Sequence, residues 1–540
     1  MVARLPFGSE HLVFVYAAVI GCAGALSTIL FRECLRQLQW WLSGTDQGLV
    51  ATARALPWWA RLLVPAIGGV LAGLTLQIGL KWIPRKGSED YMEAIAVGDG
   101  VLSARQSLVR SASSLCSVAS GASIGREGPM VQLAAMCGSL LGRALRRGFG
   151  HIRPVSVEQL RLLVACGAAA GITSAYNAPI SGAVFVSEIV FGVITTATLG
   201  PLLVSAVTAD IVLRQFFGYG AVYEMPHFDF VSGWEVLTYL GLGLAAGMAG
   251  PLLLGLIDRA RDAFARTKLP LTLRLALGGL IVGALSTQLP EVWGNGYSVV
   301  NAILQDHWSM AALLAVLFWK VLAVSATTGS GAVGGIFTPT LFVGAVLGAL
   351  FGALLQQLWP GLVPVPVAVV IGMGAFLAAC THAPLMSILM LFEMTQNYNL
   401  MVPLMATCVL GYLVSHALRV RSIYAVTQEQ IKPAAALTIA ELAVGLDFVS
   451  VGTNDLTQYA MAADRINPAL GALQDAAAPG VVELLRAVVV GAAQAAVEVG
   501  VCGELAGSVA GARLLVSLGI HELSMDPAAV DEVREGLLGT

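Results

Sequence analysis

A glutamate lies between an arginine and a glycine inside an apolar stretch of the chain. Glu127 belongs to the run Gly-Arg-Glu-Gly-Pro that begins at Gly125. A carboxylate in such surroundings is costly unless it is paired or has a function. Its charge has the sign of a small anion, so Glu127 could occupy an anion site and leave it when protonated or displaced. We therefore interpret Glu127 as a gate.

The neighbouring Arg126 allows structural alternatives to this interpretation. An ion pair between Arg126 and Glu127 would make the glutamate structural, and we favour the gate because charges within a membrane are biased toward function. Arg126 itself could add positive potential to an anion path or could pair with Glu93. Of these two roles, we favour the pairing, which would hold two helix ends together.

A second glycine-rich run has the same character. Residues 329–339 read GSGAVGGIFTP, and each run carries a proline, Pro129 or Pro339, that suits the first turn of a helix. A helix that begins there offers unpaired N–H groups and the positive end of its dipole, and glycine lets an ion approach the backbone. Neither run has the order of a phosphate-binding P-loop. We expect both runs to start helices that bind a small anion.

The elements that position these residues are expected to lie in a membrane. The chain has 540 residues, of which 57% are hydrophobic and 12% charged, against roughly 25% charged residues in a soluble domain. Several apolar runs are long enough to cross a bilayer, and the first lacks the features of a cleaved signal peptide. These runs are 12–31, 62–80, 236–257, 275–289 and 311–326. A net charge of −3 offers no basic surface to nucleic acid, and the scattered cysteines form no metal-binding pair.

An internal repeat relates the two halves of this region. The triplets 177–179 (Asn-Ala-Pro) and 382–384 (His-Ala-Pro) lie 205 residues apart, and nine positions after each proline stands a glutamate, Glu188 or Glu393. The glycine-rich runs are 210 residues apart in the same order. Paired helix breaks in two repeats mark a transport site at the repeat interface. We expect broken helices whose freed backbone groups are buried or line a polar cavity.

These motifs, together with Tyr424 after the last hydrophobic span, resemble those of the CLC chloride channel and transporter family. The resemblance covers residues 12–428. It implies an all-α polytopic membrane protein with the inverted-repeat CLC fold, in a domain of residues 1–430. It also implies Glu127 as the gating glutamate and a set of anion-binding residues. These are Gly125, Arg126 and Gly128 along the path, the backbone amides of Ile336 and Phe337, and the Tyr424 hydroxyl.

The chain departs from the family pattern in two places. The GSGIP motif is missing, and the corresponding stretch, residues 86–93, reads KGSEDYME, which resembles the ClcB-type bacterial branch. Ser88 could supply the serine hydroxyl of that motif. The inner proton-relay glutamate of the exchangers would follow Glu188, where this chain has Ile189. We predict channel-like or weakly proton-coupled transport. An H⁺/Cl⁻ exchanger, with Glu188 or water carrying protons, is the alternative.

The resemblance also carries expectations about partners and location. The expected transported ligands are chloride and similar small anions, with protons as a second candidate, and no cofactor is expected. The protein is expected to be a homodimer that spans the bacterial cytoplasmic (inner) membrane several times.

The last part of the chain, residues 433–540, has a soluble composition and resembles the C-terminal end of phosphoenolpyruvate-utilising enzymes such as enzyme I of the sugar phosphotransferase system. Strand and helix patterns alternate as in a (β/α)₈ barrel, but only about three of the eight strands are visible. The resemblance implies that Asn454, Asp455 and Arg465 contact phosphoenolpyruvate and a metal ion, and that Cys502 is the acid.

This C-terminal site lacks several parts. Ile431 stands where the family has a glutamate metal ligand, and the domain with the phospho-accepting histidine is missing. One carboxylate is too few for Mg²⁺ chemistry of this type. We therefore expect a non-catalytic fragment and no enzyme activity. The alternative from another functional class is a membrane-tethered phosphoenolpyruvate-dependent phosphotransferase.

Overall fold

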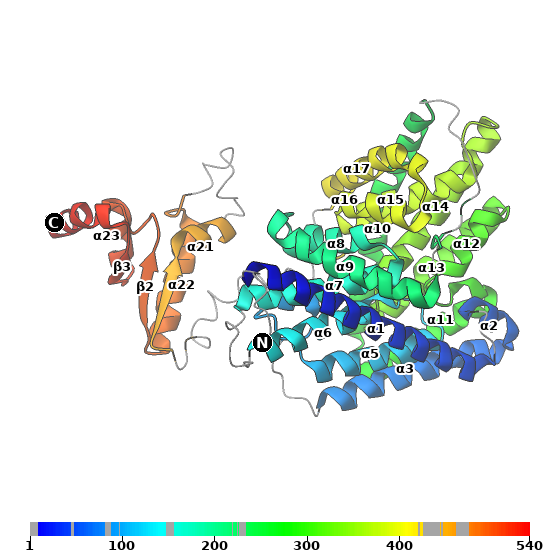
Figure 1. Ribbon diagram of the computed structural model, residues 1–540, viewed down its shortest axis with the longest axis horizontal. Helices are drawn as coiled ribbons and strands as arrows, with labels where there is room; N and C mark the ends of the chain where they lie inside the picture. Colours follow the sequence, from blue (N-terminus) through cyan, green and yellow to red (C-terminus); the bar gives the residue numbers. More distant parts are fainter. Residues whose placement is uncertain are drawn as a thin grey trace, which may run out of the picture. The chain divides into compact units, whose positions relative to one another are not determined.

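The computed structural model divides the chain into two units, Met1–Thr427 and Gln428–Thr540. The first unit is helical and the second is a small α/β unit (Figure 1). Each has its own hydrophobic core. The residues that the structure describes are 9–44, 48–81, 88–96, 98–146, 156–218, 220–223, 225, 234–419, 422–424, 443, 446–460 and 475–539.

The described part of the first unit contains eight helices that are long and apolar enough to cross a membrane. They include all five apolar runs expected from the sequence, so the prediction of a polytopic membrane protein is confirmed. The helices of this unit are α1 (Ser9–Ser43), α2 (Leu49–Ala55), α3 (Trp58–Lys81), α4 (Tyr91–Ala96), α5 (Ala104–Ala119), α6 (Glu127–Arg146), α7 (Val157–Tyr176), α8 (Pro179–Phe185), η1 (Val186–Phe191), α9 (Thr196–Phe217), α10 (Trp234–Arg266), α11 (Leu271–Gln288), η2 (Pro290–Val292), α12 (Tyr297–Gln305), α13 (Met310–Ser330), α14 (Phe337–Leu358), α15 (Val365–Thr381), α16 (Pro384–Thr395), η3 (Tyr398–Leu400) and α17 (Met401–Leu418).

Both glycine-rich runs interrupt the helices as predicted. The first separates α5 from α6, which begins at Glu127, and the second separates α13 from α14, which begins at Phe337. Pro129 and Pro339 are therefore the third residues of their helices, where a missing N–H leaves no hydrogen bond unmade. The two helix starts are 210 residues apart, the spacing of the repeat.

The helices that follow the two triplets also correspond between the two halves of the repeat. Asn177 and His382 end α7 and α15 in the left-handed conformation, with φ of 53° and 57°. The next helices, α8 and α16, begin at the prolines that follow. Elements of the two halves meet across the interior, since α3 packs on α11 and α8 packs on α16. The architecture is the inverted-repeat fold expected from the sequence.

The second unit is built on a three-stranded parallel sheet. Its strands, β1 (Phe448–Gly452), β2 (Glu498–Cys502) and β3 (Glu522–Ser524), pair in the order β1-β2-β3. Its helices are α21 (Thr453–Ala460), α22 (Pro479–Gln494), α23 (Val509–Ser517) and α24 (Val530–Leu538), with a short η5 (Pro527–Ala529). The described residues thus hold three strands of a βα pattern, as the sequence predicted.

Candidate anion-binding site

The two helix breaks meet directly. The N–H of Gly125 donates to the carbonyl of Gly335 at 2.8 Å, and the N–H of Gly335 donates back at 2.9 Å. This antiparallel bridge places the N-terminal ends of α6 and α14 next to each other. Each end carries free N–H groups and a partial positive charge. The two breaks therefore meet at the interface of the repeats, where the repeat predicted a site.

Glu127 reaches from the start of α6 to the start of α14. Its Oε1 accepts a hydrogen bond from the N–H of Thr338 at 3.1 Å, and its Oε2 accepts one from the Thr338 hydroxyl at 3.2 Å. The residue is only 5% exposed. A Cβ on Gly125 or on Gly335 would overlap the carboxylate in this position, so glycine at both positions leaves room for it. The carboxylate thus lies where the dipole of α14 favours an anion.

Two further N–H groups at this helix end have no hydrogen-bond partner among the described residues. Among the described residues, no backbone hydrogen bond is donated by Ile336 or Phe337. Ile336 precedes the first residue of α14 and Phe337 is that residue, so both belong to the orphan donors of a helix start. These are the two backbone amides that the family resemblance implies as anion-binding groups.

Aromatic packing places Tyr424 in the same neighbourhood. Its ring lies edge-on to Phe185 at 5.7 Å, and Phe185 lies 6.5 Å from Phe337. Tyr424 is also close enough to Glu127 for the two groups to interact electrostatically. The structure thus groups Tyr424 with Glu127 and the start of α14.

Two tyrosines of this neighbourhood were not expected from the sequence. The Tyr176 hydroxyl lies 3.1 Å from the Thr338 hydroxyl, and its ring lies 4.8 Å from that of Phe337. Tyr91 is 8% exposed and interacts electrostatically with both Tyr424 and Glu127. The only available signal for Tyr176 was its position directly before the Asn-Ala-Pro triplet.

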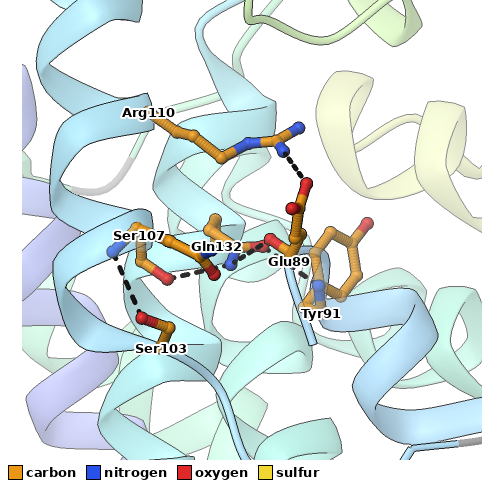
Figure 2. Close-up of polar contacts among 7 residues, drawn as sticks. Glu89, Tyr91, Ser103, Ser107, Arg110 and Gln132 are labelled. Atoms are coloured by element: carbon orange, nitrogen blue, oxygen red, sulfur yellow. Dashed lines mark hydrogen bonds and ion pairs between the residues drawn. The ribbon is translucent and has the colours of Figure 1, made fainter. Parts of the chain in front are cut away.

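A buried glutamine of α6, the helix that begins at Glu127, holds the backbone of Tyr91 (Figure 2). Gln132, in α6, accepts a hydrogen bond from the Tyr91 N–H at 3.0 Å and donates to Ser107 of α5 at 2.9 Å. The same amide group donates to the carbonyl of Glu89 at 3.3 Å. The Tyr91 ring extends away from Gln132 in Figure 2. The stretch that replaces the missing motif is therefore tied to the helix that carries Glu127.

Ser88 lies at the beginning of that stretch and has other contacts. Its N–H donates to the carbonyl of Val101 at 3.0 Å, and its hydroxyl faces Gly98. Among the described residues, no hydrogen bond joins Ser88 to Glu127 or to Tyr424. Tyr91, three residues later, is the residue of this segment that interacts electrostatically with Glu127 and Tyr424.

Arg126 does not make the expected pair. No ion pair joins it to Glu93 or Glu127 within the described part of the chain, so the favoured structural role is wrong. Glu93 belongs to α4, which packs on α7. The Arg126 side chain instead lines a cavity of about 330 Å³ together with Arg32 and Glu127.

The repeated glutamates cap helices of the opposite half. Glu188 accepts hydrogen bonds from the N–H groups of Leu385 and Met386, at 3.2 and 2.7 Å, at the start of α16. Glu393 does the same at the start of α8, where Ile180 and Ser181 donate at 2.9 and 2.7 Å. This reciprocal arrangement accounts for the spacing seen in the sequence.

The second unit brings together some of its predicted residues. Asn454 and Cys502 line a cavity of about 490 Å³ with Glu504, Ser524 and Asp526, at the C-terminal ends of the strands. Asp455, in the first turn of α21, does not line it, and Arg465 lies outside the described residues. No group of three or more His, Cys, Asp and Glu side chains that could hold a metal ion occurs among the residues that the structure describes.

Comparisons with known proteins agree with these features. The family model described as "Voltage gated chloride channel" matches residues 68–416, and that of the "PEP-utilising enzyme, PEP-binding domain" matches residues 430–539. A putative chloride channel protein, ClcB-like, of Ralstonia nicotianae is 78% identical over 76% of this chain and 95% of its own length. The voltage-gated ClC-type chloride channel ClcB of Citrobacter koseri is 41% identical over 76% of this chain and 97% of its own. The crystal structure of a slow cyanobacterial Cl⁻/H⁺ antiporter is 26% identical, covers 78% of this chain and 98% of that one, and superposes with a TM-score of 0.67.

Proposed function

The chain belongs to the voltage-gated chloride channel family, the CLC family, and we propose that it moves chloride past the carboxylate of Glu127 with little or no coupled proton movement. The observation that carries this proposal is the position of that carboxylate on the N-terminal end of α14. It accepts hydrogen bonds there from the donors that a small anion would use. Chloride and the carboxylate therefore compete for one place.

Protonation decides this competition in the proposed mechanism. A charged carboxylate is held by the Thr338 N–H and hydroxyl and by the dipole of α14. A protonated carboxyl is neutral and loses most of that attraction, so an anion displaces it. Chloride then takes the place that the carboxylate has left at the Thr338 N–H, beside the N–H groups of Ile336 and Phe337 and with the Tyr424 hydroxyl nearby. Flux should accordingly rise as the pH falls.

The proposal of weak proton coupling depends on Ile189 and Glu188. Ile189 stands where the exchangers have their inner proton-relay glutamate, and Glu188 precedes it. The side chain of Ile189, 6% exposed, has no group that can bind a proton. Glu188 next to it accepts two N–H hydrogen bonds from α16. Protonating Glu188 would weaken that cap, which makes it a poor substitute for the relay. An exchanger remains the second candidate, since one related structure is that of a Cl⁻/H⁺ antiporter.

The second unit is proposed to be a non-catalytic appendage. Its cavity gathers Asn454 and Cys502, but the only predicted metal ligand, Asp455, lies outside that lining. Phosphotransfer needs positioned partners for metal and phosphate. The location in the inner membrane and the homodimer are proposed from the family. Cross-linking of the purified protein in liposomes would test the dimer.

Flux in liposomes tests the function. Purified protein is reconstituted, and chloride efflux and external pH are recorded together over a range of pH. We expect chloride efflux that rises toward low pH in the native protein and is independent of pH in Glu127→Gln. Glu33→Gln, on the exposed face of α1, is the matched control and should keep the native profile. An unchanged pH profile in Glu127→Gln would contradict the gate.

A further inference from the structure

A short segment between α9 and α10 lines the cavity beside Glu127. Residues 220–223, which we call the strap, share the lining of this space of about 330 Å³ with Glu127 and Thr338. None of the four strap residues belongs to a helix or a strand. Tyr223 is close enough to Glu127 for the two groups to interact electrostatically. An anion that approaches Glu127 through this cavity therefore passes along the strap.

One end of the strap is anchored. The side chain of Tyr223 is only 1% exposed, and its ring packs on that of Tyr297 with the centroids 5.3 Å apart. The N–H groups of Val222 and Tyr223 both donate to the carbonyl of Met394 in α16, at 2.9 and 3.1 Å. Tyr223 is thus the fixed end of the strap.

The other end of the strap has the features of a hinge. Gly218 follows the last residue of α9 and has a φ of 78°. A Cβ on Gly218 or on Gly220 would meet no atom within 4 Å, so packing does not require glycine at either position. Glycine adds conformational freedom to the backbone, and hinges are a few loop or element-terminal residues that absorb a change in φ and ψ. We interpret these two glycines as the hinge of the strap.

A side-chain hydrogen bond connects the strap to α12. The Tyr297 hydroxyl donates to the carbonyl of Val222; we call this bond the latch. Tyr297 is the first residue of α12 and lines the same cavity. The latch therefore holds the strap at the space next to Glu127.

Tyr297 itself stands on a firmly packed turn. Lys320 of α13, which is 0% exposed, donates from its Nζ to the carbonyls of Val292 and Gly294 in this turn, at 3.0 and 2.7 Å. A Cβ on Gly296 would overlap the ring of Phe342, so the turn also packs closely on α14. A charge within a membrane helix is costly and usually functional. The latch thus joins a well-held tyrosine to a strap that is hinged at one end.

We propose that Tyr297 is a positioning residue, whose hydroxyl holds the strap across the way by which chloride reaches Glu127. Release of the latch opens this way. The inference rests on the proposed chloride transport. The latch joins two neutral groups, so the net free energy of breaking it is small. It should control the entry of anions and leave the pH dependence unchanged, because the contacts between Glu127 and Thr338 do not involve Tyr297.

Cysteine modification tests the latch without transport. Ala175, in α7, lines the cavity. An Ala175→Cys protein is treated with an anionic methanethiosulfonate, and labelling of that position is followed by mass spectrometry. Adding Tyr297→Phe keeps the ring and removes the latch, so the labelling rate should rise about fivefold. Adding Gly220→Ala stiffens the hinge at a position with room for a Cβ, and should lower the rate about threefold.

The control for this test is Tyr398→Phe, at a position 77% exposed, which should leave the labelling rate of Ala175→Cys unchanged. Equal labelling rates with and without Tyr297→Phe would overturn the proposal, whatever the flux of the variants.

Chloride flux in liposomes separates this inference from the proposed function. Tyr297→Phe should raise the flux at limiting chloride about fivefold, while the pH of half-maximal flux stays native. Native flux at limiting chloride in Tyr297→Phe would overturn the proposal. A lowered melting temperature together with a shifted pH midpoint would also overturn it, because Tyr297 would then act on the fold as a whole. Absence of chloride flux in the native protein would contradict the proposed function, and the labelling rates would still decide whether the latch exists.

Discussion

The hydroxyl of Thr338 helps to determine how strongly the charged carboxylate of Glu127, the proposed gate, is held at the start of α14. It donates to Glu127 at 3.2 Å, while the backbone N–H of the same residue makes the other bond. Removing the hydroxyl leaves the helix end intact but holds the charged carboxylate less strongly. A hydrogen bond to a charged group contributes about 1.5–3 kcal/mol.

The Thr338→Val variant should therefore open at higher pH. We expect the midpoint of its chloride flux to move toward alkaline pH by about one to two units, since 1.36 kcal/mol corresponds to one pH unit. Flux against pH in liposomes measures this midpoint. Thr340→Val, whose native hydroxyl bonds the carbonyl of Phe337 in the same helix, is the control. A midpoint that moves equally in both variants would point to a general effect on α14.

The Tyr424 hydroxyl is expected to contact the ion itself. Tyr424→Phe keeps the ring that packs on Phe185 and removes only the donor. Loss of one hydrogen bond to a charged ligand should weaken chloride binding by about tenfold, as measured by calorimetry. Tyr398→Phe, at a position 77% exposed, should bind as the native protein does. Equal affinity in Tyr424→Phe and native protein would remove this hydroxyl from the site.

The charged and backbone-determining residues of the candidate site could be predicted from the sequence, and Tyr424 through the family resemblance, whereas Tyr91 and Tyr176 could not. Glu127 differs from its apolar surroundings, and glycine and proline mark helix starts by their own stereochemistry. Tyr91 and Tyr176 follow no such rule, because a tyrosine in an apolar helix is usual in any membrane protein. The role of Arg126 was misjudged for a related reason, since the sequence does not show which way an arginine beside a glycine points.

At the scale of elements, two glutamates hold the two halves of the repeat together, because each caps the N-terminus of a helix in the opposite half. Glu188 and Glu393 each accept two backbone N–H bonds from a helix of the other half. The 205-residue spacing made the repeat visible in the sequence. It did not reveal that each glutamate serves the opposite half, because this depends on the inverted packing of the repeats.

Removing the cap that Glu188 makes on α16 should destabilise the protein without changing the pH dependence of chloride flux. We expect Glu188→Ala to lower the free energy of unfolding by about 1–2 kcal/mol and to lower the melting temperature in detergent. The pH dependence of chloride flux should remain, because the contacts of Glu127 are untouched. Glu89→Ala, at an exposed residue, is the control. Native melting behaviour in Glu188→Ala, together with altered proton movement, would instead assign Glu188 to a proton path.

At the scale of the whole molecule, the second unit is expected to be dispensable for transport. All residues of the candidate pore precede it, and each unit has its own hydrophobic core. A chain that ends at Lys432 should therefore give the same chloride flux per molecule in liposomes. A truncated protein that reaches the membrane and yet carries no chloride would make the second unit regulatory.

Proton coupling is also a property of the whole molecule, because a proton must cross from one side to Glu127. An isolated charge in apolar protein costs several kcal/mol, so the path needs ionisable groups or water. Ile189 removes the most direct ionisable stop, and Glu188 is occupied as a cap.

We expect the reversal potential in opposing chloride and pH gradients to lie at the chloride equilibrium potential. Ile189→Glu should shift it toward the proton gradient if the rest of the path persists, and Ile189→Gln, which has a similar shape but binds no proton, should not. A native reversal potential that moves systematically with the pH gradient would show that water or another group already completes the path, and the passive interpretation would then be wrong.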